Sequence, residues 1–284
     1  MNDQTFIGID LGGTHIRAGL VKGGELSGIS HSPINAQGTE RQVLQQMFDM
    51  LDQLINPAVS GIGIGVPGLV DNESGVVFDV INIPSWKKIP LKKLIEDRYN
   101  QQVLINNDAN CFALGEFYFG KGKGHDSMIG LTIGTGLGSG IILNKKLYGG
   151  KTGGAGEFGM IDYLDKYYEY YACGQFFQNV YGIDGETVFR KAQEGDKECI
   201  ELYAQLGTHL GNAIKTILYA YDTDLIILGG SVRNAFSFFS DAMWGQIKTF
   251  AFSRAVDRLQ IQVSELKNSG ILGAVALHYD MKKV

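Results

Sequence analysis

Short apolar runs that end in glycine or small polar residues recur along the chain, and they predict strands. After the first run, residues 16–20 alternate apolar and polar side chains, and a second turn follows at Gly23-Gly24. This pattern predicts an antiparallel meander at the start of a sheet. The apolar runs lie at residues 6–11, 61–66, 103–105, 128–133, 141–143 and 225–228.

Four longer segments predict helices. In the first, residues 39–55, apolar side chains keep the i, i+3, i+4 spacing of a helix with one buried face. Thr39 and Gln42 fit a capping box at its start. The other three predicted helices are residues 90–99, 197–221 and 270–279. Together the helices and apolar runs are typical of the α/β class.

The order strand, glycine turn, strand occurs at residues 10–14 and again at residues 134–140. Glycine makes up 39 of the 284 residues, roughly twice its usual ~7% share. Glycine leaves backbone N–H groups uncovered, so a phosphate can approach them closely. No Gly-Lys-Ser/Thr follows either turn and neither turn opens a helix, which excludes a Walker motif and a dinucleotide fingerprint. Two copies of this strand–glycine turn–strand pattern predict two similar domains that face each other across a cleft. The pattern is also compatible with a triphosphate held between the two hairpins.

Asp108 lies where an apolar run meets a helical pattern. Residues 103–105 are followed by Asn106, Asn107 and Asp108, and the helical pattern starts at Ala109. This position puts the carboxylate at the carboxyl end of a sheet, where open α/β folds bind ligands. The alternative is that Asp108 only caps the helix, as aspartate often does. The glycine turns elsewhere in the chain favour the ligand-binding interpretation.

Other candidate positions also have two interpretations each. Asp10, at the end of the first run, either orients a hydrated magnesium ion or is an exposed residue of a hairpin turn. Glu157, in a glycine-rich segment, either accepts hydrogen bonds from ligand hydroxyls or is solvated. Gly229-Gly230 either lies flat against a ring such as adenine or is a plain strand-to-helix turn. Trp86 either stacks on a sugar or covers the core, and the core interpretation is favoured.

Composition narrows the class of protein. With 44% hydrophobic and 19% charged residues, the chain is typical of a globular protein. The formal net charge of −5 does not favour a nucleic acid or an anionic membrane as partner. Three widely spaced cysteines suit a reducing compartment. The N-terminal residues lack a signal-peptide pattern and no apolar run reaches ~18 residues, so we expect a cytoplasmic protein.

Six motifs, taken in order, give the chain a resemblance to a known family. They are DLGGTHIRAGL at 10–20, GVPG at 65–68, NNDAN at 106–110, TIGTGLGSGI at 132–141, GGAGEFG at 153–159 and LGGSV at 228–232. In these motifs and their order the sequence resembles the ROK family of bacterial sugar kinases and sugar-responsive repressors. That family belongs to the actin/hexokinase-like superfamily.

The resemblance implies a fold and a set of site residues. The fold would be α/β, with two ribonuclease H-like, actin/hexokinase-type domains that have mixed sheets around an interdomain cleft. We expect the domains at residues 1–113 and 114–270, with a last helix, 271–284, packed back on the first. The residues implied to bind ATP are Asp10, Gly12, Gly13, Thr14, Thr135, Gly136, Gly229 and Gly230, with Asp10 close to Mg²⁺. Those implied to bind the sugar are Gly68, Asn107, Asp108 and Glu157, with Asp108 as the general base.

The chain departs from the family pattern where zinc and further sugar contacts are expected. Many members carry a histidine after GExG and a CxCGxxGC motif, which bind a structural zinc ion. The corresponding residues here are Met160, Tyr171, Cys173 and Gln178. A family glutamate that contacts the sugar would fall on Val180. We therefore expect no zinc site, and aromatic burial in place of a metal to hold residues 163–177. The candidates to replace the lost sugar contacts are Glu169, Tyr170 and Tyr171.

The function we expect is that of a cytoplasmic kinase, by default a homodimer, that uses ATP and Mg²⁺ to form a hexose 6-phosphate. Phosphoryl transfer needs positioning, a metal, amide groups near the phosphates and a base for the alcohol proton, which these motifs offer. Glucose is the expected acceptor, and fructose, mannose, N-acetylmannosamine or a glucoside are alternatives.

Two other functions are alternatives to a kinase. One is a sugar-sensing transcriptional regulator. Such regulators place a helix-turn-helix ahead of the first phosphate motif, and its start at Asp10 leaves no room for one. The other is an actin-like or chaperone ATPase without a sugar. The GVPG and NDAN motifs and Glu157, each matched to the sugar-kinase pattern, argue against it.

Overall fold

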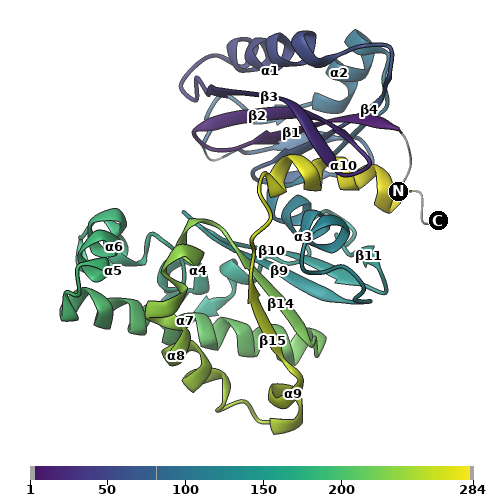
Figure 1. The fold of residues 1–284 in the computed structure, drawn as a ribbon. Helices are drawn as coiled ribbons and strands as arrows, with labels where there is room; N and C mark the ends of the chain where they lie inside the picture. The colour runs from purple at the N-terminus through teal and green to yellow at the C-terminus, as the bar shows by residue number, and fades with distance from the viewer. Residues whose placement is uncertain (1–3, 81, 282–284) are drawn as a thin grey trace. The chain divides into compact units, whose positions relative to one another are not determined.

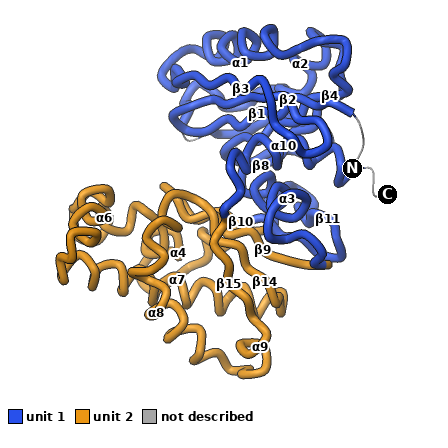
Figure 2. Tube along the Cα trace, in the orientation of Figure 1, with its two compact units in different colours: residues 1–125, 140–155, 265–284 blue, residues 126–139, 156–264 orange. Residues whose placement is uncertain are grey.

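A computed structural model describes residues 4–80 and 82–281 of the chain (Figure 1). Contacts divide the chain into two compact units (Figure 2). Unit 1 comprises Met1–His125, Gly140–Ala155 and Glu265–Val284, and unit 2 comprises Asp126–Ser139 and Gly156–Ser264. The domain boundaries expected from the sequence, at residues 113 and 270, stay predictions. Residues 1–3 of the expected first domain and 282–284 of the expected last helix lie outside the described residues.

The main sheet of unit 1 has the strand order β3-β2-β1-β4-β8. Its strands are β1 (Thr5–Leu11), β2 (His15–Lys22), β3 (Glu25–Pro33), β4 (Val59–Val66) and β8 (Val103–Asn107). β1, β2 and β3 form the predicted antiparallel meander, whereas β4 pairs in parallel with both β1 and β8. Asp10 lies opposite Gly65, which lies opposite Asn106. The carboxyl ends of three parallel strands therefore bring the 10–14 turn close to the NNDAN motif.

Helices, a small sheet and the segment 140–155, which carries β11 (Lys146–Leu147) and the end of β10 (Leu137–Leu143), complete the described part of unit 1. The helices are α1 (Glu40–Leu54), α2 (Leu91–Tyr99), α3 (Asp108–Phe119) and α10 (Ser269–Met281), and the small sheet has β5 (Leu69–Asp71), β6 (Val76–Phe78) and β7 (Lys88–Ile89). The predicted capping box starts α1, with Thr39 and Gln42 bonded to each other's backbone N–H. α10 packs against α3, β1 and β4. Trp86 is fully buried among the core side chains, which confirms its core interpretation.

The second large sheet has the order β11-β10-β9-β14-β15. Its strands are β9 (Met128–Ile133), β10 (Leu137–Leu143), β11 (Lys146–Leu147), β14 (Leu225–Gly229) and β15 (Gln260–Val263). β14 pairs in parallel with β9 and β15, as β4 does with β1 and β8. The two sheets therefore repeat one topology, in agreement with the two strand–glycine turn–strand motifs.

The rest of unit 2 is mainly helical. Its elements are η1 (Phe158–Met160), β12 (Asp162–Tyr163), β13 (Lys166–Tyr167), α4 (Tyr168–Tyr171), α5 (Phe176–Tyr181), α6 (Gly185–Gln193), α7 (Lys197–Tyr221), η2 (Ser231–Ala235), α8 (Phe236–Ile247) and α9 (Ser253–Arg258). α7 matches its predicted bounds and packs along α8. The short elements between residues 162 and 193 lack a periodic pattern long enough to predict them. Of the helices within the described residues, none has the length and apolar character to cross a bilayer.

Candidate functional site

Asp108 is the first residue of α3, and its neighbour Asn107 is the N-cap. The Asn107 side chain accepts a hydrogen bond from the Ala109 N–H at 2.8 Å, and Asp108 Oδ1 shares the same N–H at 2.8 Å. Asp108 is exposed. Because Asn107 already provides the cap, capping alone does not account for an aspartate at position 108.

Asp10 and Asp108 lie close to the same buried thiol in unit 1. Burial raises the pKa of Cys111, and the negative charges of Asp108 and Asp10 raise it further. A Cβ on Gly65 would lie 3.2 Å from the Cys111 Sγ and 3.8 Å from the Asp108 Cα. The small residue at position 65 therefore lets the start of α3 approach the end of β4, and the structure brings the two predicted carboxylates to one region.

Asp10 combines burial with an oxygen-donor side chain. Burial raises the pKa of its carboxyl, and the positive charge of Arg17 opposes this shift. The carboxyl lies against the first turn of α10, where a Cβ on Gly270 would come within 2.4 Å of the Asp10 Cγ. Gly270 thus leaves room for the carboxyl at the strand end. In proteins Mg²⁺ usually keeps several water ligands and is bound through only one or two carboxylates. The single carboxylate of Asp10 is therefore compatible with the expected ion.

The GVPG and NNDAN motifs form one hydrogen-bonded unit. The Asn107 side-chain amide donates to the Gly68 carbonyl at 3.1 Å. Gly68 has a φ of 90°, in the left-handed region that favours glycine. The buried Asn106 side chain accepts from the Asn107 N–H and from the Asn110 side-chain amide, both at 2.8 Å. The predicted sugar residues Gly68, Asn107 and Asp108 therefore lie together in unit 1.

The first glycine turn is a tight hairpin between β1 and β2. The Gly12 N–H donates to the His15 carbonyl at 2.9 Å. A Cβ on Gly13 would come within 2.6 Å of the Asn82 side-chain nitrogen, so glycine allows this close contact. Thr14 is exposed, and its hydroxyl lies 3.0 Å from the His15 Nδ1.

The second glycine turn, between β9 and β10, is held by residues from α4 and the segment that follows it. The Gly134 N–H donates to the Gly136 carbonyl at 3.0 Å within the turn. The Gly134 carbonyl accepts from the Gly174 N–H at 2.7 Å. The Leu137 N–H, at the end of the turn, donates to a carboxylate oxygen of Glu169 at 2.8 Å. The turn is therefore fixed from outside by groups that its own sequence does not contain.

The Gly229-Gly230 motif lies at the end of β14, beside β9. Gly229 is buried and lies opposite Thr132. Gly230 has a φ of 77°, and a Cβ on it would come within 2.2 Å of the Ile133 carbonyl oxygen. Any side chain at position 230 would therefore clash with the strand end that leads into the second glycine turn. This close approach explains the second glycine of the motif.

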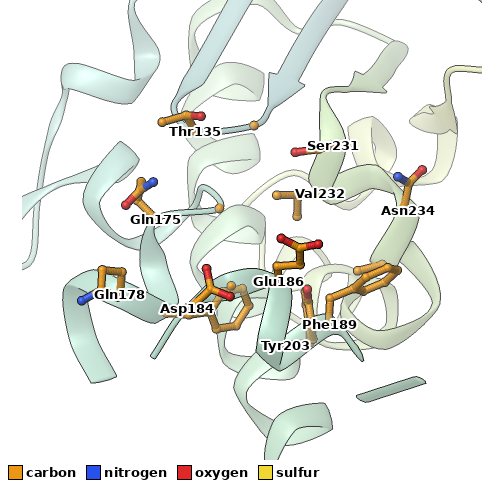
Figure 3. Close-up of a pocket in the computed structure, with 15 residues that line it drawn as sticks. Thr135, Gln175, Gln178, Asp184, Glu186, Phe189, Tyr203, Ser231, Val232 and Asn234 are labelled. Atoms are coloured by element: carbon orange, nitrogen blue, oxygen red, sulfur yellow. The ribbon is translucent and has the colours of Figure 1, made fainter. Parts of the chain in front are cut away.

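A cavity of about 490 Å³ lies beside these two glycine motifs (Figure 3). Gly134 and Thr135 line it from the second turn, and Ser231 and Val232 line it from the segment after Gly230. Its aromatic wall comprises Phe177, Phe189 and Tyr203, and its polar side chains include Gln175, Gln178, Asp184, Glu186 and Asn234. The volume of this cavity and its mixture of aromatic and polar lining residues are typical of a pocket for a small organic ligand.

Glu157 lies at the start of η1 and is exposed. Partial burial of its carboxyl raises the pKa of Glu157, and the negative charge of Glu169 raises it further. The preceding residue is fixed to β10, because the Ser139 hydroxyl donates to the Gly156 carbonyl at 2.6 Å. The predicted sugar glutamate is therefore held on the strand that follows the second glycine turn.

Aromatic rings pack around Tyr171, one of the family's zinc-ligand positions. Met160 is 58% exposed. The Tyr171 ring lies 5.1 Å from the His209 ring, and the Tyr163 hydroxyl lies 3.2 Å from the His209 Nδ1. Phe176 adds a ring 5.5 Å from His209, and burial lowers the pKa of His209. The aromatic packing predicted for residues 163–177 is present.

Within residues 4–80 and 82–281, no group of three or more acidic, histidine or cysteine side chains has an arrangement that could hold a metal ion. The predicted lack of zinc nevertheless stays a prediction.

Most of the cavity wall cannot be recognised in the sequence. Gln175, Glu186 and Phe189 come from α5, α6 and their flanks, where single glycines occur but no apolar run ends in a glycine turn to mark a site. Asn234 follows Gly230 by four residues, and this nearness is the one signal that the sequence offers for it.

Comparison with known proteins identifies relatives along the whole chain. The family model for the ROK family matches residues 6–281. The glucokinase of Halalkalibacterium halodurans is 28% identical over 312 residues, which cover 96% of this chain and 94% of that protein. The xylose repressor of Caldicellulosiruptor bescii is 27% identical over 96% of this chain and 77% of its own length.

Among solved structures, a ROK family glucokinase from Streptomyces griseus in complex with glucose and AMPPNP is similar, with a TM-score of 0.82 and 28% identity. The match covers 96% of this chain and 98% of that chain. This similarity confirms the predicted α/β fold of the actin/hexokinase type. On the family match over residues 6–281, the chain belongs to the ROK family, which includes sugar kinases and repressors.

Proposed function

We propose that the protein is an ATP-dependent sugar kinase that phosphorylates the 6-hydroxyl of a hexose, with glucose or a close relative as acceptor. The observation that carries the proposal is Asp108, exposed at the carboxyl end of β8 while Asn107 serves as the cap. A carboxylate in that position can accept the proton of a bound alcohol. Similarity to a glucokinase crystallised with glucose and an ATP analogue supports both substrates.

In this reaction, Asp108 takes the proton of the 6-hydroxyl as the hydroxyl oxygen bonds to the γ-phosphorus of ATP. The bond from the γ-phosphorus to the bridging oxygen breaks, and ADP leaves. Asn107, fixed by its hydrogen bond to Gly68, and Glu157 would orient the ring hydroxyls. Asp10 would hold Mg²⁺ through water, and the ion supplies positive charge to the phosphates.

The cavity in unit 2 is the proposed site for the adenosine part of ATP. Its aromatic wall suits a planar base, and the acidic Asp184 and Glu186 suit the neutral ribose hydroxyls better than phosphates. The phosphates would then lie toward the second glycine turn, at Thr135–Gly136, whose N–H groups suit anions. Charge therefore favours one orientation of the nucleotide.

The candidates for the missing sugar contacts already have protein partners. Glu169 accepts from Leu137, and the Tyr170 hydroxyl donates to the Asn179 carbonyl at 2.9 Å. The Tyr171 hydroxyl donates to Asp165. Each would have to exchange a partner to contact a sugar, so the proposal of glucose depends on the glucokinase relatives. Fructose, mannose, N-acetylmannosamine and glucosides stay alternatives.

A ROK-type transcriptional regulator is the second candidate, because the xylose repressor is nearly as similar as the glucokinase. A protein that only binds a sugar needs no base, so the placement of Asp108 favours the kinase. Our proposal includes a homodimer in the cytoplasm that binds neither nucleic acid nor membrane.

The decisive experiment is a substrate screen. Purified protein with ATP and Mg²⁺ is offered hexoses, amino sugars and glucosides, and ADP release is measured for each. We expect release to depend on the sugar and to be fastest with glucose or a close relative, and the product to carry the phosphate on the 6-hydroxyl. Sugar binding without any ADP release, together with sugar-dependent DNA binding, would instead support the regulator.

A further inference from the structure

A second cavity, of about 530 Å³, lies in unit 2 between the end of α7 and α9 (Figure 1). Tyr219 and Asp222 line it from the end of α7, and Phe250 and Phe252 line it from the segment between α8 and α9. Among the described residues, none that lines this cavity also lines the cavity beside the glycine motifs. At a rise of ~1.5 Å per residue, Tyr219 lies about 24 Å along α7 from Tyr203, which lines that first cavity. The two cavities are therefore separate.

Arg254 and Arg258 give the second cavity a positive wall. They are four residues apart on α9, so their side chains lie on the same side of this helix. Both are exposed, and within residues 4–80 and 82–281 neither has a hydrogen bond or an ion pair. The described lining contains these two arginines and one acidic residue, Asp222, so positive charge exceeds negative charge. Because a guanidinium group donates parallel hydrogen bonds to phosphate oxygens, this wall suits a phosphate.

Aromatic rings form the apolar part of the same cavity. Phe250 is buried, and its ring lies 4.5 Å from that of Tyr219 and 5.7 Å from that of Phe252. Tyr219 is 61% exposed and Phe252 is 63% exposed, although both are large rings that are normally covered. Exposed aromatic rings bind nucleic-acid bases by stacking, whatever the identity of the base. The aromatic part of the lining therefore suits a planar base.

We propose that this cavity is a second nucleotide site, in which Arg254 and Arg258 bind the phosphate and the exposed rings of Tyr219 and Phe252 bind the base. Asp222 is the lining carboxylate that can accept hydrogen bonds from ribose hydroxyls. A sugar phosphate fits less well, because its hydroxyl groups would face aromatic rings. The inference goes beyond the proposed function and does not depend on it, since a kinase and a regulator would both retain this cavity.

Calorimetry with AMP tests the site, because AMP combines a base with one phosphate. The titrations use Gly134→Val protein, in which the added side chain occupies the first cavity. On this background, one variant combines Arg254→Gln with Arg258→Gln, which removes both positive charges, and another carries Phe252→Ala, which removes an exposed ring. Arg41→Gln, at an exposed position of α1, is the matched control. Adenosine, inorganic phosphate and glucose 6-phosphate are titrated for comparison.

The Gly134→Val protein should bind one AMP per chain. The double arginine variant should weaken this binding at least about tenfold, since hydrogen bonds from charged groups to the phosphate are lost. Phe252→Ala should weaken it by about tenfold, the effect of losing one stacked base. Adenosine and inorganic phosphate should each bind more weakly than AMP, because each lacks one half of the ligand.

Three results in these titrations would overturn the proposal. The first is an AMP affinity in the double arginine variant equal to that in the Arg41→Gln control. The second is the absence of AMP binding to the Gly134→Val protein. The third is tighter binding of glucose 6-phosphate than of AMP, which would exclude a base as the group that the aromatic rings bind.

The oligomeric state separates a ligand site from a contact between two copies of the chain. Sedimentation gives the mass of the wild-type protein and of the double arginine variant, both without ligand. We expect the two masses to be equal. A variant with half the mass of wild type would show that the cavity wall belongs to an interface between copies, and the proposal would be overturned.

Discussion

At the scale of single residues, Asn107 and Asp108 have different roles at the start of α3. Asn107 caps the helix, and Asp108 is the proposed base. Asn107 caps α3 and binds the Gly68 carbonyl, so its side chain is fixed by two partners. Asp108 follows it in the first turn of the helix and is exposed. Their order along the chain therefore leaves the structural role to the amide and places the ionisable group at the surface.

The first prediction concerns Asp108→Asn. Asparagine keeps the size and the hydrogen bonding of the side chain but cannot accept a proton at neutral pH. Because positioned base catalysis contributes about 10²–10⁴-fold, kcat should fall by that factor while the affinity for the sugar changes little. Asp257→Asn, at an exposed position of α9, is the control. Near wild-type kcat in Asp108→Asn would contradict the role of the base.

The second prediction concerns stability and Asp10. Because burial raises the pKa of Asp10 in the folded protein, folding favours the protonated carboxyl, and the ionised form lowers stability at neutral pH. The free energy of unfolding should therefore gain a contribution as pH falls through the raised pKa. Asp10→Asn removes the ionised form, so without Mg²⁺ its Tm should exceed that of wild type at pH 7, and the difference should shrink toward pH 4.

Thermal unfolding followed by circular dichroism measures this effect, with Asp241→Asn on the exposed face of α8 as the control. The same variant should lose phosphoryl transfer, since the proposed magnesium contact is gone. A stable but inactive protein would show that the buried carboxylate is kept for function at a cost in stability. A Tm below that of wild type would contradict the argument.

At the scale of elements, the sequence predicts those helices and strands whose periodicity, cap or turn lies within their own residues. The β1–β2 meander, α1 with its Thr39–Gln42 box and α7 each have a period, a cap or a turn in their own sequence. The cavity wall could not be predicted, because Gln175 and Phe189 become neighbours only through tertiary packing. Glu169 was identified only as a candidate sugar contact, since its bond to the Leu137 N–H joins residues 32 apart.

A third prediction tests the glycine turn as an element of the nucleotide site. Gly134 lines the cavity, and a Cβ on it would contact nothing within 4 Å. Gly134→Val should therefore fold normally but occupy ligand space and weaken binding of the ATP analogue at least tenfold, with glucose affinity unchanged. Gly245→Val, where a Cβ also meets nothing within 4 Å, is the matched control.

Calorimetry with each ligand measures both affinities. Gly136→Val is a less clear test, because a Cβ at position 136 would meet the carboxylate of Glu169 and disturb the turn itself. If Gly134→Val bound the analogue as tightly as wild type, the cavity would not be the nucleotide site.

A fourth prediction concerns the aromatic cluster around His209. Phe176 is 1% exposed and its ring contacts those of Phe177, Tyr181 and His209. Phe176→Ala should lower the free energy of unfolding by about 3–5 kcal/mol, since it removes a buried ring and leaves a cavity. Phe252→Ala, at a residue that is 63% exposed, should cost less than about 1.5 kcal/mol. Equal effects in denaturant titrations would show that the cluster does not stabilise unit 2.

At the scale of the whole molecule, one arrangement occurs twice in the chain. Each large sheet has a glycine turn between its second and third strands in spatial order, followed by two strands in parallel. The first copy carries Asp10 and Asp108, and the second carries the cavity, Glu157 and Glu169. The two sheets thus have the same topology but carry different side chains at their strand ends. The first carries two aspartates, and the second lies beside a cavity with an aromatic wall.

The fifth prediction concerns the metal content of the whole protein. Structural zinc needs about four cysteine or histidine ligands in tetrahedral geometry, and this chain has Cys173 as the one such residue at the four aligned family positions. Its thiol donates to the Thr135 carbonyl, and burial raises the pKa of Cys173 to about 12, so the thiolate that zinc requires is disfavoured.

We therefore expect the protein to fold and work with magnesium alone. Elemental analysis of protein purified without a metal-binding tag should find far less than one zinc per chain. A zinc-selective chelator should leave the Tm unchanged if, as we expect, ring packing around His209 takes the place of the metal. Near one zinc per chain, lost on chelation together with thermal stability, would mean that the alignment through residues 160–178 is wrong and that other side chains hold the ion.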